Sequence, residues 1–129
     1  MATLVVRACL VFGFSCFVSD TACAQDAKTQ FEKTVRPLFE RKCFQCHSSK
    51  ADELKGNLKL ETVELILKGG DQGAAIVPGD NDSFLLRAIR YQVEDFQMPP
   101  SGRLEDKDVA LIEKWVKTLG DEAKRQAPK

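Results

Sequence analysis

Four stretches of the chain have the apolar spacing of amphipathic helices, and polar or glycine-rich segments separate them. Residues 31–42 form one apolar face, with a kink or restart expected at Pro37. Residues 62–68 predict a short helix that begins after a threonine cap and ends at Gly69. Residues 81–83 offer caps for a third helix, which is expected to continue through Tyr91.

The last helix has the clearest pattern. Asp106 is a suitable cap, and Gly120 is expected to end the helix. Its apolar stripe consists of Val109, Ile112, Val116 and Leu119. Trp115 lies beside this stripe and is expected to pack in the core between the first and last helices. The polar tail 121–129 is expected to fray.

The chain has no alternating strand pattern and no internal repeat, so the predicted fold class is all-α with long loops. The loops at 69–79 and 93–103 form a large irregular fraction of so short a chain. Long structureless loops usually signal function or disorder. A large flat prosthetic group would account for them, because loops can wrap it.

The first residues have the pattern of a secretory signal peptide. One positive charge precedes an apolar run at 8–18, and Ala22-Cys23-Ala24 supplies small residues for cleavage after Ala24. The run is too short for a membrane span, which needs about 20 residues. The predicted organisation is therefore a signal peptide at 1–24 and an exported domain at 25–129, with a helical core at about 28–120. Lipid attachment at Cys23 is the alternative to release of a soluble form.

Length and charge narrow the function classes. The 129 residues suffice for one small domain, and a domain of this size often needs an extra staple. Lys plus Arg equals Asp plus Glu, at 19 each. Because nucleic-acid binding needs clustered basic charge, the balance argues against a broad nucleic-acid interface.

The cysteines identify the candidate chemistry. Three of the five precede residue 25, so the mature chain keeps Cys43 and Cys46, followed directly by the single histidine, His47. The C-x-x-C-H spacing is typical of c-type haem attachment. Two thiols add across the two vinyl groups of one macrocycle, and the histidine then reaches the iron. The predicted cofactor is one covalently attached haem c.

Three other interpretations of these residues compete. A structural zinc site usually needs four Cys or His ligands, and the mature chain has only three such residues. A thioredoxin-like redox pair would lie near a βαβ pattern, which is absent. A disulfide between the two cysteines would close too short a loop to stabilise the fold much.

Met98 is the candidate for the second axial ligand of the iron. It is the one methionine of the mature chain, and it stands before two prolines in a loop. Methionine is a frequent sixth ligand in electron-transfer cytochromes, and prolines would hold the sulfur in place. The alternative is an ordinary loop residue.

Other residues are candidates for supporting roles. A ligating histidine usually donates its second ring N–H to a carbonyl, which the loop near Pro78 could supply. Arg87, Arg90 and Tyr91 could hold the haem propionates, with Arg90 taken as the cofactor-binding candidate. The alternative for these three side chains is a solvated helix face.

The chain resembles the planctomycete-type cytochrome c domain, a mono-haem member of the class I cytochrome c fold. The matching segments are 31–38, 43–47, 67–71, 76–79, 86–91, 98–100 and the helix around Trp115. The resemblance implies that the first and last helices cross beside the haem. It also implies thioether bonds at Cys43 and Cys46, with His47 as proximal and Met98 as distal ligand.

These features predict an electron carrier or relay rather than an enzyme, because two strong axial ligands leave the iron no open position. Its redox partner proteins would lie in the periplasm or an equivalent extracytoplasmic compartment. The alternatives are a peroxidase-like or gas-binding haem protein with a labile Met98, and an interaction module without haem.

Overall fold

The computed structural model describes residues 26–128. The predicted signal peptide and Cys23 lie outside these described residues. The helical elements are α1 (Ala27–Gln30), η1 (Phe31–Val35), α2 (Arg36–Lys42), η2 (Lys55–Asn57), α3 (Val63–Lys68), α4 (Phe84–Ile89), η3 (Glu94–Phe96) and α5 (Asp106–Gln126). Over residues 26–128 the chain forms no strand beyond one isolated bridge, so the predicted all-α class is confirmed.

The first helical stretch begins earlier than predicted, and its irregular turn lies before the proline. The Asp26 side chain accepts the Thr29 N–H at 2.7 Å and caps α1. The π-helical turn η1 follows, in which the Arg36 N–H donates to the Phe31 carbonyl. Pro37 lies in the first turn of α2, where the proline ring and its missing N–H are tolerated. The expected irregularity is therefore present one turn upstream of Pro37.

The last helix is longer than predicted, because α5 passes through Gly120 and ends at Gln126. Gly120 is buried against Gly79, and a Cβ on Gly120 would lie 2.4 Å from the Gly79 Cα. The glycine thus permits close backbone packing and does not end the helix. Glu122 accepts the Ala27 N–H at 2.6 Å, which ties the additional turns to α1. The prediction that the whole tail frays is wrong for 121–126.

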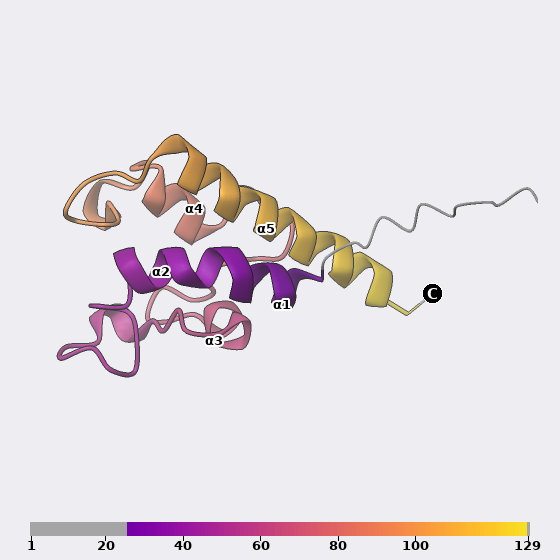
Figure 1. Ribbon diagram of the computed structural model, residues 1–129, viewed down its shortest axis with the longest axis horizontal. Coiled ribbons are helices and arrows are strands. Elements are labelled where there is room, and N and C mark those ends of the chain that lie inside the picture. Colours follow the sequence, from indigo (N-terminus) through magenta and orange to yellow (C-terminus); the bar gives the residue numbers. More distant parts are fainter. Residues whose placement is uncertain (1–25, 129) are drawn as a thin grey trace, which may run out of the picture.

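The first and last helices pack directly on each other (Figure 1). Trp115 is fully buried, its ring centroid lies 5.3 Å from that of Phe31, and its Nε1–H donates to the Ala27 carbonyl at 3.0 Å. The predicted core position of Trp115 is confirmed. The same core includes Phe39, Ile66, Ile76, Leu86 and Ile112.

The short helices surround this pair. In Figure 1, α4 lies along α5, and α3 lies on the other side of α1 and α2. The predicted threonine cap of α3 is present, because the Thr62 hydroxyl accepts the Leu65 N–H at 3.3 Å. Helix α4 ends at Ile89 rather than at Tyr91, whose φ of 62° is left-handed and incompatible with a continuing helix. Among residues 26–128, no helix has both the length and the apolarity to cross a membrane.

Candidate functional site

A cavity of about 270 Å³ lies between the end of α2, helix α4 and three loops. Its walls are mostly apolar side chains and glycine backbone, with charged groups from Lys55, Asp71 and Asp95. The remaining lining residues are Phe39, Cys43, His47, Gly56, Leu58, Leu60, Gly70, Gln72, Gly73, Ala75, Phe84, Leu85, Ala88, Ile89, Phe96 and Met98. Three residues that the sequence selects for haem binding, Cys43, His47 and Met98, therefore share one cavity.

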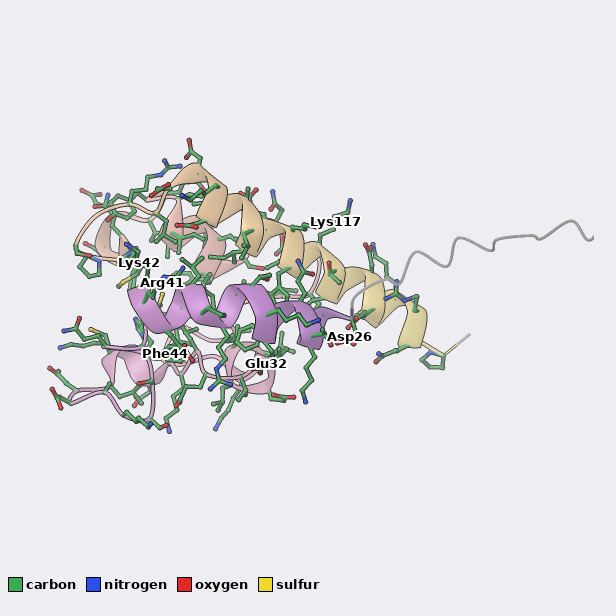
Figure 2. All side chains as sticks on the ribbon, viewed as in Figure 1. Asp26, Glu32, Arg41, Lys42, Phe44 and Lys117 are labelled. Atoms are coloured by element: carbon green, nitrogen blue, oxygen red, sulfur yellow. The ribbon has the colours of Figure 1, made fainter. Side chains whose placement is uncertain are left out.

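The cysteines lie where α2 ends. Figure 2 shows Arg41, Lys42 and Phe44 close together at this end of the helix, away from Asp26 at the start of α1. Cys43 and Cys46 are both free thiols, so the disulfide interpretation does not apply to this structure. Burial raises the pKa of the Cys43 thiol to about 12, with a smaller contribution from Cys46. Cys43 is thus a neutral thiol at neutral pH, and Cys46 lies beside the cavity without lining it.

His47 is half-buried, and its ring orientation is set by the backbone that returns after the loop. Its Nδ1 lies 3.3 Å from the Leu58 carbonyl, which accepts when Nδ1 carries the proton. Burial lowers the pKa of His47, while the hydrogen bond to Leu58 acts in the opposite direction. A neutral ring with its proton on Nδ1 leaves the Nε2 lone pair available for a metal ion.

The carbonyl that faces His47 is not the one suggested by the sequence. Pro78 is exposed and does not line the cavity, because its loop packs against Gly120 of α5. The Leu58 carbonyl takes the position instead. Sequence reasoning missed it because every residue has a carbonyl, and no local pattern at Leu58 distinguishes this one.

A second strip of backbone holds the motif in place. The Lys55 N–H donates to the Cys46 carbonyl, and the Leu60 N–H donates to the His47 carbonyl, both at 3.0 Å. Glu61 accepts from the Ser49 N–H at 2.8 Å and from its hydroxyl at 2.6 Å. The segment from the second cysteine to Ser49 is therefore fixed along its length by residues 55–61.

Met98 is held against the end of α4. Its N–H donates to the Ala88 carbonyl at 3.2 Å, and the Tyr91 hydroxyl donates to the carbonyl of Pro99. The Met98–Pro99 peptide bond is cis. These contacts bring the methionine loop to the same cavity as His47, although the two residues lie far apart in the sequence.

The predicted role of Arg90 is not supported by its position. Its guanidinium donates to Glu113 at 2.7 and 3.0 Å and to Asn81 at 2.8 and 3.0 Å, and Arg90 does not line the cavity. Its donors are therefore directed to α5 and to the loop before α4. The described residues contain no cluster of three or more His, Cys, Asp or Glu side chains that could hold a metal ion.

Comparison with known families shows what the segment that builds most of this site resembles. Residues 43–102 match the family model described as Planctomycete cytochrome C. The chain contains a planctomycete-type cytochrome c domain. The match includes every cavity-lining residue except Phe39, and it does not extend over α1, α2 or α5. No curated protein and no solved structure matches the chain.

The cytochrome domain has a cavity whose residues fit a haem. It is apolar enough to bury a macrocycle, it presents the Cys43 thiol at its wall, and it brings an imidazole and a thioether to one space. The match of residues 43–102 to this family model supports a haem-binding cytochrome. The charged lining residues are few, as expected for a site that excludes water.

Proposed function

We propose that this protein is an exported mono-haem cytochrome that passes single electrons between redox partner proteins. The observation that carries the proposal is the meeting of Cys43, His47 and Met98 at one apolar cavity in a planctomycete-type cytochrome c domain. Haem supplies an iron that cycles between the ferrous and ferric states. The protein supplies the ligands, the burial and the hydrogen bonds around it.

The site residues have separate tasks. Cys43 and Cys46 would hold the haem covalently through thioether bonds. His47 would bind its iron through Nε2, while the Leu58 carbonyl holds the proton on Nδ1. Met98 would be the second protein ligand of the iron, and its loop is held by Ala88 and Tyr91. The apolar wall would exclude water from the bound group.

Electron transfer is preferred over substrate chemistry because His47 and Met98 would together leave the iron no open position for a substrate. An enzyme or gas sensor needs an open or labile sixth position and distal polar groups. The lining from α4 and η3 is mostly apolar, with Ala88, Ile89 and Phe96 among its residues and Asp95 as its one charged residue. A haem held in this way could still exchange electrons with a docked protein.

The proposed compartment is the periplasm or its equivalent. The support is the signal-peptide pattern at 1–24 together with the attachment motif, because c-type haem is attached after export. The redox partners are proposed to lie in the same compartment.

Replacing Met98 tests this function. Oxidised wild-type holoprotein is expected to show the Met–iron charge-transfer band, and its reduced form is expected to bind carbon monoxide slowly. A Met98→Ala variant should lose the band, bind carbon monoxide at least tenfold faster and have a lower reduction potential, because methionine ligation raises it. Gln97→Ala, at the exposed neighbouring position, is the control and should behave like wild type.

Two results would contradict the proposal. A wild-type protein that lacks the band and binds carbon monoxide rapidly would have an open iron. A Met98→Ala variant with unchanged spectra would show that Met98 is not the ligand.

A further inference from the structure

The two arginines of the α4 region have different surroundings. Arg90 uses its guanidinium donors on Glu113 and Asn81. Arg87 makes no ion pair and no side-chain hydrogen bond with any of residues 26–128 that the structure describes. Of these two arginines, only Arg87 therefore has guanidinium N–H groups that no described protein group accepts.

The Nε of Arg87 is also buried without a hydrogen-bond partner. Arg36 is the other described residue whose Nε lacks one, but its guanidinium is paired with Glu32 at 3.0 Å and with Glu40 at 3.3 Å. No carboxylate of residues 26–128 pairs with the Arg87 guanidinium. Buried donors in folded proteins nearly always have an acceptor, so an unpartnered one calls for an explanation.

The position of Arg87 supplies that explanation. Its Cζ lies 5.7 Å from the centroid of the Phe84 ring, one helical turn earlier on α4. Phe84 lines the cavity and meets the Phe96 ring edge-to-face at 5.3 Å. The guanidinium is thus stacked on Phe84, a residue of the cavity wall, although Arg87 itself does not line the cavity. It lies at the margin of the site, where a substituent that projects from the bound group would meet it.

Other charged groups at the cavity are already engaged or have the wrong sign. Lys55 is paired with Glu53 at 2.7 Å. Asp71 accepts from the Asn57 amide at 2.7 Å, and Asp95 is a second carboxylate. Arg87 is therefore the available cation for an anionic substituent on the bound group.

We propose that Arg87, and not Arg90, binds a carboxylate of the group held in this cavity, namely a haem propionate. This inference rests on the proposed function, since the propionates belong to the haem. A guanidinium forms short, bidentate bonds with a carboxylate, and stacking on Phe84 fixes its plane. The positive charge offsets the propionate charge, which disfavours the ferric state and raises the reduction potential.

The test is the pH dependence of the reduction potential of holoprotein. In Arg87→Gln, the propionate loses its cation, so the apparent pKa in the potential–pH curve should rise by about 1 to 3 units. The potential at pH 7 should fall relative to wild type. Arg87→Lys retains the charge and should restore most of both effects. A purely structural role for Arg87 would not produce this shift.

Matched variants decide which residue is responsible. Arg90→Gln should leave the potential–pH curve unchanged. The proposal is overturned if Arg87→Gln holoprotein has the wild-type curve, or if Arg90→Gln reproduces the shift. If Arg87→Gln does not accumulate, NMR of wild-type holoprotein should show proximity of the Arg87 Nε–H to the propionate methylene protons, and its absence would overturn the proposal.

The failure of this inference can be distinguished from failure of the proposed function. Wild-type protein without covalent haem would overturn both. Covalent haem, a Met–iron band and an unchanged Arg87→Gln curve would overturn the assignment of Arg87 alone.

Discussion

At the scale of single residues, the environment of the motif is as important as its members. The sequence predicts Cys43, Cys46 and His47 because the spacing itself is informative. It does not predict the Leu58 carbonyl, which approaches His47 only after the loop folds back. Glu61 is likewise unmarked, although it binds Ser49 through both the N–H and the hydroxyl. Partners of this kind depend on loop geometry, so local patterns do not reveal them.

The stability of the fold is expected to depend on pH through the Glu61 carboxyl. The Ser49 hydroxyl and N–H hold the pKa of Glu61 below its usual value of 4.5. A carboxyl with a lowered folded pKa stabilises the fold above the unfolded pKa, and this contribution is lost as the pH falls through the lower folded pKa. Glu61→Gln holoprotein should therefore be less stable than wild type at pH 7, by on the order of 1 kcal/mol or less at this solvent-screened site.

Denaturant titrations from pH 7 to pH 3 measure this effect. The stability difference between wild type and Glu61→Gln should be constant above about pH 5 and should shrink below pH 4.5. Glu94→Gln is the control, because Glu94 is exposed and its side chain has no hydrogen bond among the described residues. An equal difference at pH 3 and pH 7 would show that the Ser49 contacts do not depend on the charge.

At the scale of elements, helix patterns predict position better than length. The apolar stripe of α5 and the threonine cap of α3 agree with the structure. The end of α5 does not, because Gly120 serves as a packing contact and not as a stop signal. The pattern also does not predict the π-helical turn η1, because one extra residue in a single turn hardly changes the apolar spacing. Tertiary contacts decide these cases.

The contact between Gly79 and Gly120 can be tested by adding one methyl group. A Cβ on Gly120 would lie 2.4 Å from the Gly79 Cα and 2.7 Å from its nitrogen, so backbone must move. Helix propensity alone predicts that Gly120→Ala stabilises the protein by about 0.5–1 kcal/mol. Overpacking is expected to dominate, with a net loss of about 1–3 kcal/mol.

Thermal unfolding of Gly120→Ala holoprotein measures the balance. Asp121→Ala is the matched control, because it adds a good helix former at the exposed neighbouring position without a clash. A Gly120→Ala variant as stable as wild type would mean that the backbone at the contact between Gly79 and Gly120 shifts at little cost in free energy. The haem spectrum should be unchanged, since the contact lies away from the cavity.

At the scale of the whole molecule, irregular segments and helices build the cavity together. The sequence predicts that loops wrap a flat group, and segments at 55–60, 70–75 and 95–98 contribute lining residues. It does not predict which side chains meet there, because Phe39, Phe84 and Phe96 come from three separate elements. That arrangement follows from packing, which helical periodicity does not encode.

Folding should therefore depend on the bound group. Without it, the loops lose the surface on which they pack, and their ordering entropy is not offset. A Cys43→Ser/Cys46→Ser variant purified without haem is expected to be largely unfolded. Circular dichroism of the haem-free and haem-containing proteins measures the difference, and equal helicity with equal melting temperatures would contradict coupled folding.

The central claim is that two cysteine sulfurs of this chain are bonded to one haem. The direct measurement is the intact mass of the protein after export by cells with working cytochrome maturation machinery, under denaturing conditions. The account predicts the mass of the chain from residue 25 plus one haem, and the polypeptide mass alone for Cys43→Ser/Cys46→Ser. A wild-type protein with only its polypeptide mass would contradict the account.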